Sequence, residues 1–446
     1  MVDEGSRARI FGIVGAAAAA ALIVALGAYL VATAHPTVKG KTIIRWCVDP
    51  NPIRKEQIKL FERSHPRIEV INDTGAEAQR LLTQLAGDVP PDVMALYDPQ
   101  SIRLFARNGV LLDLTPYVKQ YHIPVDKLYP GLDPYIRFEG KIVGIPENCG
   151  PYVLFYNKRL FREASLPYPK PGWTWDECLA AAKKLSGHKV IGGRKVLVKG
   201  LFISNTDWWF FIWMYNGHLF SPDGKRCLMN SPEVKKGIRY WADLRLKYHV
   251  MPTTSEAQSM SPTGSWGGDA LLFRSSVVAM NISGRWLSIQ YREEKHLDWD
   301  VVSVPHGPNR VTLLASKCYS IPKTSHNREA SLTFISHLLG RDNQLLVANY
   351  GDGMPVLDDR AIKKAFAYNP EYPNERNNQV HLDEMKYARV QEFSPYINNL
   401  DVGAIMSVEL DRMWLGEQSP DQACDTIADR INAIIRRNLA NPNFLD

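Results

Sequence analysis

Apolar residues follow two patterns along this chain, short runs and a helical repeat. Apolar runs at 42–48, 68–71 and 92–97 predict β-strands, and Pro-containing or polar breaks separate them. Between the runs, apolar residues recur every three or four positions, which predicts helices, including one at 79–86. This alternation of strands and helices is typical of a parallel sheet flanked by helices.

A second alternation of the same kind begins at the apolar run 153–157. Helical periodicity then continues at four further places, 174–185, 232–247, 328–347 and 420–437. At the start of one of these helices, Ser231 and Pro232 supply a capping residue and a first-turn proline. No internal repeat or low-complexity linker separates the two alternating regions of the sequence, so we expect two lobes of one molecule.

The strongest hydrophobic segment lies at the N-terminus. Arg7 and Arg9 precede an uncharged run from Ile10 to Val31, and an A-x-A triplet ends at Ala34. This order describes a secretory signal that is cleaved after Ala34. At about 1.5 Å per residue, the run is also long enough to cross a hydrocarbon core of about 30 Å. Residues 1–34 are therefore predicted to be a signal peptide or an uncleaved anchor, with the remaining chain outside the cytoplasm.

Composition and charge are those of an ordinary folded protein. Of 446 residues, 45% are hydrophobic and 22% are charged, and the net charge is +6. No run of five or six like charges occurs in the sequence, so nucleic acid is not expected as a partner. The six cysteines follow no C-x-x-C spacing, which argues against structural zinc; we expect most of them to be small buried residues.

Familiar catalytic signatures are missing from the sequence. It contains no G-x-G-x-x-G, Walker A, H-E-x-x-H or G-x-S-x-G motif, and it predicts no cofactor and no metal site. A glycosidase, however, needs only two carboxylates from distant positions, and Glu147, Asp98 and Asp269 could supply them. We favour the alternative that these carboxylates bind a ligand through hydrogen bonds or cap helices.

Aromatic and polar residues gather at strand ends and loops. The densest cluster is DWWFFIWMY at 207–215, and smaller ones lie at 97–98, 147–152, 266–269 and 284–286. Sugars pack their C–H faces on aromatic rings, and their hydroxyls need partners such as Asp, Asn, Glu or Arg. These clusters therefore favour carbohydrate binding. The segment 208–215, however, is more typical of a core helix, whereas Gly284 and Arg285 suggest that Trp286 projects from a loop.

In the order and spacing of several segments, the chain resembles the extracellular solute-binding proteins of sugar ABC transporters, the maltose-binding-protein-like group (family 1). The resemblance covers roughly residues 41–437. It is carried by IKLFERSHPRIEVI, PPDVMALYDPQSIRLFARNGVLLDLTPYV, GKIVGIPENCGPYVLFYNKRLFREASLPYPKPGWTWDECLAAAKKL, VVAMNISGRW, DWDVVSVPHGP, ASKCYSIPKTSHNREASLTFISHLLG and GDGMPVL. The most specific parts are the YNK…TW-D-E pair and AMNISGRW.

The resemblance implies an α/β fold of two lobes, the type II periplasmic-binding-protein fold, preceded by an N-terminal hydrophobic helix. The two lobes are joined by crossing hinge strands, so each lobe is discontinuous in sequence. The implied first lobe comprises 36–150 and about 300–345. The implied second lobe, mainly helical, comprises 151–299 and about 346–446.

The resemblance also implies a function in binding and not in catalysis. A monomer would capture a mono- or oligosaccharide between its lobes and deliver it to the permease subunits of an ABC transporter. It would act in the periplasm, or attached through its N-terminal segment to the outer face of the bacterial cytoplasmic membrane. The alternatives are a receptor for a phosphorylated polyol or a polyamine, a secreted glycan-acting enzyme, and a ligand-sensing module beside a signalling receptor. A phosphate ester would need clustered Arg or Lys or helix N-termini, and a polyamine several carboxylates.

The expected ligand contacts combine the aromatic clusters with positions that the resemblance implies. They are Asp49, Asn51, Tyr97, Asp98, Glu147, Asn148, Tyr152, Trp208, Trp266, Asp269, Trp286, Gly353 and Met354. The counterpart of Trp286 in the family commonly stacks on sugar. If this indole stacks on a sugar ring, Trp286→Ala should cost about 2–4 kcal/mol of binding free energy.

Overall fold

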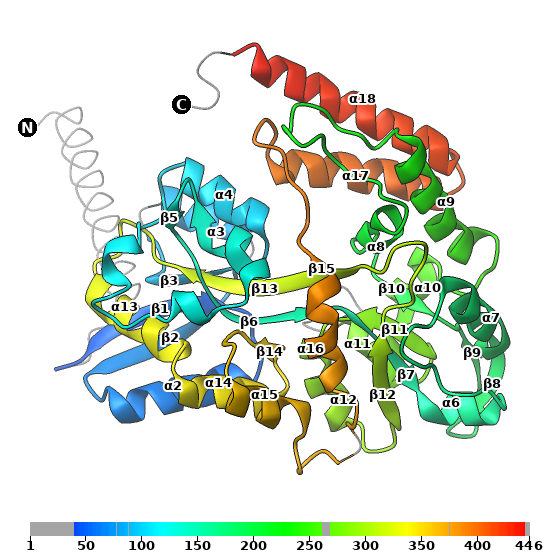
Figure 1. Cartoon of the computed structure of the whole chain (residues 1–446), viewed down its shortest axis with the longest axis horizontal. Helices are drawn as coiled ribbons and strands as arrows, with labels where there is room; N and C mark the ends of the chain where they lie inside the picture. Colours follow the sequence, from blue (N-terminus) through cyan, green and yellow to red (C-terminus); the bar gives the residue numbers. More distant parts are fainter. Residues whose placement is uncertain (1–39, 77, 88, 261–267, 374, 442–446) are drawn as a thin grey trace, which may run out of the picture.

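Two lobes lie side by side in the computed structural model and are joined by long strands that run from one lobe into the other (Figure 1). The structure describes residues 40–441, apart from 77, 88, 261–267 and 374. The segment Ile10–Val31 and Ala34 lie outside the described residues. Within the part of the chain that is described, no helix combines the length and the apolar character that a membrane span requires.

The first lobe is built on a mixed sheet. The strand order is β14 (Met354–Pro355), β6 (Ile145–Pro151), β13 (Thr312–Ser320), β3 (Val93–Leu96), β1 (Thr42–Val48), β2 (Ile68–Thr74), with β15 (Ala388–Arg389) beside β13. Strand β1 is parallel to both β2 and β3, as the sequence predicts for these three strands. Strand β13, in contrast, runs antiparallel to β3 and β6, so the complete sheet is mixed.

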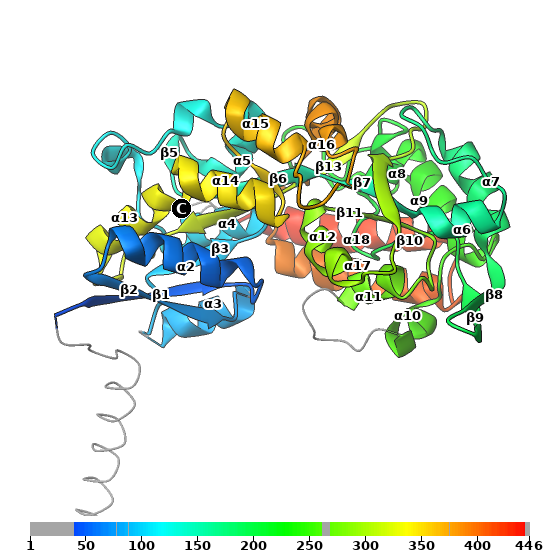
Figure 2. The same ribbon diagram turned by 90° about the horizontal axis from the view of Figure 1, so that it is seen from below.

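Helices cover both faces of this sheet (Figure 2). They are α2 (Ile53–Ser64), α3 (Ala78–Ala86), α4 (Pro99–Arg107), α5 (Asp133–Ile136), α13 (Arg328–Leu338), α14 (Arg341–Tyr350) and α15 (Arg360–Ala367), with the small hairpin β4 (Arg137–Phe138) and β5 (Lys141–Ile142). The single helix predicted at 328–347 is in fact two, because the chain turns at Gly340. A Cβ at Gly340 would lie 2.9 Å from the carbonyl oxygen of His337.

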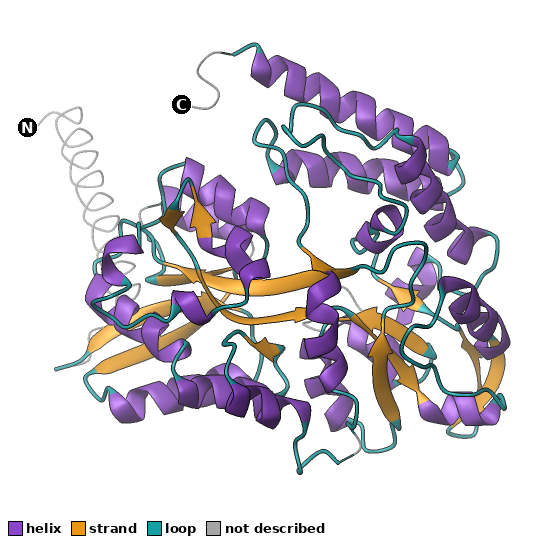
Figure 3. Cartoon of the chain, in the orientation of Figure 1, coloured by secondary structure: helices purple, strands orange, loops and turns teal. Residues whose placement is uncertain are grey.

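The second lobe has a smaller sheet and more helix, as the secondary-structure colours show (Figure 3). Its sheet has the order β10 (Phe202–Ile203), β11 (Met280–Ser283), β7 (Val153–Asn157), β12 (Trp299–Ser303), and β8 (Gly187–Ile191) pairs separately with β9 (Arg194–Val198). Its helices are α6 (Lys158–Glu163), α7 (Trp175–Leu185), α8 (Trp209–Trp213), α9 (Pro232–Leu246), α10 (Thr254–Met260), α11 (Gly268–Arg274), α12 (Ser288–Glu293), α17 (Asn399–Trp414) and α18 (Pro420–Leu439); α16 (Gln379–Glu384) lies at the junction of the lobes. Short 3-10 helices occupy Thr115–Tyr117, Val125–Lys127, Pro130–Leu132, Arg285–Leu287 and Met385–Tyr387.

Local hydrogen bonds explain where several helices begin. Ser231 accepts a hydrogen bond from the backbone of Val234 and is followed by Pro232, so the predicted start of α9 is confirmed. Thr174 and Ser419 cap α7 and α18 in the same way, each within a reciprocal capping box. These caps satisfy N–H groups that have no partner inside the helix.

Each lobe has its own hydrophobic core, and the cores show where the chain crosses between lobes. The first core includes Leu314 and the second Leu313, so β13 spans both. Residues of α14, β14 and α15 also pack in the first core, among them Ala348, Met354, Ile362 and Phe366. On this packing we propose that the first lobe includes about 312–367, whereas the sequence assigned 346 onward to the second. All six cysteines are buried, as expected.

Candidate functional site

A cavity of about 470 Å³ lies between the lobes. The first lobe contributes Tyr97, Asp98 and Gln100, where β3 ends and α4 begins. The second lobe contributes residues on either side of the start of α8 and along one face of α17: Asn205, Thr206, Trp208, Trp209, Asn399, Val402, Gly403, Met406, Ser407, Leu410, Asp411 and Trp414. A ligand that fills this cavity contacts both lobes.

Aromatic rings form much of the cavity wall. Trp208 and Trp209 stack on each other, with ring centroids 4.2 Å apart and an interplanar angle of 21°. Tyr152, at the crossing from β6 to β7, faces Phe210 at 5.8 Å. Tyr97 is 40% exposed, so one aromatic residue of the first lobe is open to a ligand. The segment 208–215 thus combines a core helix with a cavity wall. Helix α8 is buried, and Trp208 and Trp209 at its start line the cavity.

The polar groups around the cavity are amides, hydroxyls and two carboxylates. Among the described residues that line it, none is Lys, Arg or His. One carboxylate belongs to Asp98, which caps α4 by accepting hydrogen bonds from the backbone N–H and the hydroxyl of Ser101, at 2.7 and 2.6 Å. The other belongs to Asp411 on α17, which is exposed. This wall offers hydrogen-bond donors and acceptors but no positive charge.

Tyr97 is held in place from behind the cavity. Its hydroxyl donates to Asp49 Oδ2 at 3.1 Å, and the backbone N–H of Asp49 donates to the hydroxyl oxygen at 3.0 Å. Burial of the hydroxyl and the nearby Asp49 carboxylate raise the pKa of Tyr97 well above its ordinary value. The phenol therefore stays protonated and acts as the donor in the bond to Asp49.

Asp49 and Glu147, two expected ligand contacts, belong to a buried charge network beneath the cavity. Arg54 lies 3.1 Å from Asp49 Oδ2 and 2.8 Å from Asp352 Oδ2. Lys317 lies 3.1 Å from Glu147 Oε2 and 3.4 Å from Asp352 Oδ2. Three carboxylates thus surround two cations. Glu147 is fully buried and also accepts hydrogen bonds from Gln57 and Tyr319, so its carboxylate is sealed from the cavity.

The network keeps the carboxylates of Glu147 and Asp49 ionised. Burial alone would raise the pKa of Glu147, but Lys317 and Arg54 outweigh burial and hold this pKa below its ordinary value. Arg54 and Lys317 likewise lower the pKa of Asp49 against the effect of burial. A glycosidase acid needs a raised pKa and access to the scissile bond, so Glu147 does not fit that role.

Asn51, Asn148, Gly353 and Met354 also lie in or against this network. The side-chain amides of Asn51 and Asn148 donate to the Asp352 carboxylate at 2.9 and 3.0 Å. Gly353 has a φ of +81°, a backbone conformation that favours glycine. The side chain of Met354 is fully buried. None of these four is among the described residues that line the cavity, so we propose for them a role in supporting the site.

Trp286 adjoins the cavity through another aromatic residue. Its half-buried ring meets the edge of Tyr152, with centroids 5.4 Å apart. The indole lies over Gly284, where a Cβ would come within 1.8 Å of it. Trp286 is not among the described residues lining the cavity. Trp266 lies outside the described residues; Asp269 belongs to α11, but the structure does not describe its side chain.

Several residues that line the cavity are not predicted from the sequence, mainly those of α17 and of the segment before it. No helix is predicted at 399–414 from the sequence pattern, although Asn398 caps this helix by accepting a hydrogen bond from the backbone N–H of Asp401. An Asn two or three residues before an apolar repeat was the available signal. Gln100, Asn205 and Gln391 carry no distinguishing local pattern, and only the fold brings them to the cavity.

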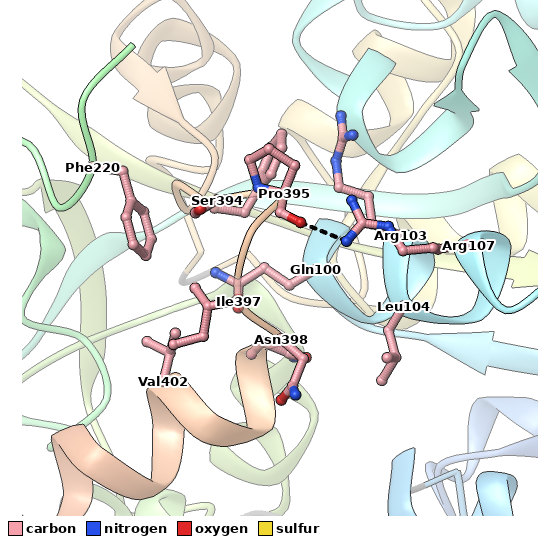
Figure 4. A pocket seen from close by; sticks show the side chains of 12 residues that line it. Gln100, Arg103, Leu104, Arg107, Phe220, Ser394, Pro395, Ile397, Asn398 and Val402 are labelled. Atoms are coloured by element: carbon pink, nitrogen blue, oxygen red, sulfur yellow. Dashed lines mark hydrogen bonds between the residues drawn. The ribbon is translucent and has the colours of Figure 1, made fainter. Parts of the chain in front are cut away.

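The lobes also contact each other beside the cavity, through residues 391–395, which we name the interlobe segment. Figure 4 shows Arg107 of α4 donating to the carbonyl of Pro395, at 2.5 Å. The guanidinium of Arg103 lies 3.8 Å from the ring centroid of Phe393. Glu392 binds the second lobe, accepting from Trp213 Nε1 at 2.9 Å and from the backbone of Leu219 at 2.7 Å. The segment therefore joins α4 to the second lobe.

Comparison with known sequences places most of this chain in a described protein family. The family model described as "Bacterial extracellular solute-binding protein" matches residues 49–345. A Brucella abortus protein that carries the name "Putative binding protein" is 23% identical over 407 residues, which are 89% of this chain and 93% of that one. The sn-glycerol-3-phosphate-binding periplasmic protein UgpB of Rhizobium meliloti is 23% identical over 371 residues, 79% of this chain and 82% of that one.

Solved structures show the same fold. An ABC substrate-binding protein of Listeria monocytogenes in complex with cycloalternan has a TM-score of 0.78 at 23% identity, covering 88% of this chain and 98% of that one. A solute-binding protein of Thermotoga lettingae bound with α-D-tagatose has a TM-score of 0.76 at 22% identity, covering 89% and 100%. UgpB of Mycobacterium tuberculosis in complex with glycerophosphocholine has a TM-score of 0.73 at 19% identity, covering 90% and 100%. The predicted two-lobed fold is confirmed.

Proposed function

This chain belongs to the bacterial extracellular solute-binding protein family, and we propose that it captures an uncharged carbohydrate between its lobes and delivers it to the permease of an ABC transporter. It acts outside the cytoplasm as a monomer, and its N-terminal segment directs it there or attaches it to the membrane. The ligand leaves the protein chemically unchanged.

The observation that carries this proposal is the composition of the cavity wall. Trp208, Tyr152 and Tyr97 offer aromatic surface to the C–H faces of a sugar. Asn205 and Gln100, one from each lobe, offer amides that both donate to and accept from hydroxyls. Its volume of about 470 Å³ lies within the range of small-molecule sites.

A phosphate ester is the second candidate, because relatives named for sn-glycerol-3-phosphate and glycerophosphocholine share the fold. Phosphate recognition relies on Arg, Lys or helix N-termini. The described cavity lining has no cationic side chain, and the nearby cations Arg54 and Lys317 are already neutralised by three carboxylates. The carbohydrate is therefore the better fit.

Binding would work through closure of the two lobes. A ligand in the cavity contacts both lobes at once only when they are close together, so it favours the closed arrangement by its differential affinity. The closed protein would then present the ligand to the permease. This step needs no chemistry from the binding protein.

The test is a thermal-shift screen followed by calorimetry. Mono-, di- and oligosaccharides are compared with sn-glycerol 3-phosphate and spermidine at equal concentration. A sugar present at 100 times its Kd should stabilise the protein by about 2.7 kcal/mol. A shift with glycerol phosphate alone would contradict the proposal. Chromatography after overnight incubation should recover the bound sugar intact, and time-dependent cleavage would support the glycan-acting alternative instead.

A further inference from the structure

A two-stranded hairpin projects from the end of the second lobe that lies away from the first lobe (Figure 1). It consists of β8 and β9, which pair with each other and form a separate sheet. Its turn is Gly192-Gly193, with φ values of +56° and +76°, the left-handed conformations that tight hairpin turns need. The hairpin therefore has a defined conformation although its tip extends beyond the core.

The outward face of the hairpin combines apolar and cationic side chains. Side chains alternate between faces along a strand, and the register pairs Val190 with Lys195 and His188 with Leu197. Val190 is 69% exposed, so it places an apolar side chain in solvent near the tip. On the opposite face, Ile191 packs against the second core, and Arg194 and Lys189 lie on that same face beside the turn. Val190 and Lys195 thus stand side by side in solvent.

Positive charge predominates in the sequence of the hairpin and its flanks. Residues 178–206 include six Lys and Arg and no Asp or Glu. Two of these cations are engaged: Lys199 pairs with Glu256 at 3.3 Å, and Lys183 lies 4.1 Å from the ring centroid of Tyr248. The other four have no ion pair with any residue that the structure describes: Lys184, Lys189, Arg194 and Lys195.

We propose that the tip of this hairpin rests on an anionic lipid bilayer. Lys and Arg near an anionic membrane surface attract its headgroups, and an apolar side chain between them enters the boundary with the acyl chains. A bilayer accepts a small convex tip, whereas a stable protein partner needs roughly 800 Å² of matching surface. Figure 2 shows the hairpin of the second lobe and the start of β1 in the first lobe on the same side of the molecule. The hairpin and the start of β1 can therefore approach the same membrane. This contact is independent of what the cavity binds.

An environment-sensitive fluorophore at the tip tests the proposal in the full chain. The native cysteines are buried, so a cysteine introduced by Val190→Cys is labelled selectively. The control label is at Leu415→Cys, a position on the same lobe that is 74% exposed. With phosphatidylcholine vesicles containing phosphatidylglycerol, the label at 190 should shift to the blue and the label at 415 should not. No shift at 190, an equal shift at both positions, or the same shift without phosphatidylglycerol would overturn the proposal.

A charge variant separates the hairpin from the general positive charge of the protein. We combine Lys189→Gln, Arg194→Gln and Lys195→Gln in one variant. It should bind the anionic bilayer roughly 100-fold more weakly, at about fivefold per cation, and should lose the fluorescence response. The matched control removes three exposed cations of the same lobe that have no described ion pair, through Lys225→Gln, Arg226→Gln and Lys295→Gln. If the control loses the response equally, the hairpin is not the contact.

Discussion

The hydroxyl of Tyr97 and the main chain and carboxylate of Asp49 are joined by two hydrogen bonds, of 3.0 and 3.1 Å. Asp49 is in turn held by Arg54, whose Nη2 lies 3.1 Å from Asp49 Oδ2. The exposed face of the Tyr97 ring belongs to the cavity wall, whereas its hydroxyl belongs to the buried network. The network thus positions an aromatic surface of the cavity wall, although neither Asp49 nor Arg54 is among the described residues that line the cavity.

Tyr97→Phe should therefore weaken ligand binding while keeping the ring. The variant removes the donor to Asp49 and the acceptor for its backbone N–H, and each such hydrogen bond contributes about 0.5–1.5 kcal/mol. We expect affinity to fall about 5- to 10-fold as the ring gains freedom, and Tyr97→Ala to weaken binding further. Calorimetry with the best sugar measures both. Equal affinity in Tyr97→Phe and the unaltered protein would show that the hydroxyl does not position the ring.

Trp208 and Trp286 allow a residue that lines the cavity to be compared with one that lies behind the lining. Trp208 lines the cavity, and Trp286 contacts it only through Tyr152 in this structure. If Trp208 carries the sugar, Trp208→Ala should cost about 2–4 kcal/mol of binding free energy, through lost stacking and lost burial. Trp286→Ala should cost less binding free energy, and its main effect should be a loss of folding stability, because its indole packs against the second core. Calorimetry and denaturant melts of both variants separate the roles; the reverse ranking would support Trp286 as the sugar platform.

The sequence predicted the elements of this fold better than their arrangement. Strands at 42–48 and 153–157 and the helix at 420–437 lie within one or two residues of β1, β7 and α18, because local periodicity and caps define them. The antiparallel insertion of β13 between β3 and β6 was not predictable. It joins residues about 170 positions apart, such as Ala315 and Gly150, and no local pattern encodes that pairing.

The candidate site shows the same division. Tyr97, Asp98, Tyr152 and Trp208 were expected at a ligand site and do line the cavity. Glu147 could not be distinguished from them in the sequence, because an acidic residue near a strand end gives no sign of whether it will be buried. Its burial depends on Lys317, which pairs with it from a strand 170 residues later.

Glu147→Gln should reveal a structural role through stability. It leaves Lys317 and Arg54 with fewer negative partners in a buried setting, where breaking an ion pair costs about 3–5 kcal/mol. We expect a clear fall in the free energy of unfolding. The exposed control Glu371→Gln should change stability by no more than about 0.5 kcal/mol. A Glu147→Gln protein as stable as the control would contradict the network that the structure shows.

His381 should make the free energy of unfolding depend on pH. Burial and the neighbouring Arg285 lower the pKa of this fully buried histidine to about 3. Between pH 6.5 and 3 the unfolded chain binds a proton that the native protein excludes, so native stability falls as pH falls. From pH 6.5 to 5, the unaltered protein should lose about 2 kcal/mol relative to His381→Gln.

The difference in unfolding free energy between the unaltered protein and His381→Gln is free of the contributions of other titrating groups, among them Asp300. Burial raises the pKa of Asp300 to about 6, so it gives the opposite slope: the stability that its proton provides is lost as pH rises from 4 to 6. Denaturant melts across pH 4.5–7 provide the free energies. Proton NMR of the His381 ring gives an independent check, and a midpoint near 6.5 would refute its burial as a neutral group.

The interlobe segment should influence closure as well as affinity. Arg103 lies on Phe393, and Arg107 donates to the carbonyl of Pro395, so both hold α4 of the first lobe against a segment that Glu392 fastens to the second. A cation–π contact at a partly exposed site contributes about 0.5–1 kcal/mol, and a hydrogen bond to a charged group about 1.5–3 kcal/mol. Together they predict that Arg103→Gln/Arg107→Gln shifts the balance between open and closed lobes roughly 30-fold toward open.

Small-angle scattering should then show a larger radius of gyration for the double variant without ligand, and a return to the unaltered value at saturating sugar. Affinity should fall by the same factor as the closed population, because neither arginine lines the 470 Å³ cavity among the residues described. The matched control is Arg63→Gln on the exposed face of α2, which has no described ion pair. Reduced affinity without any change in scattering would mean that these arginines act on the ligand and not on the closure of the lobes.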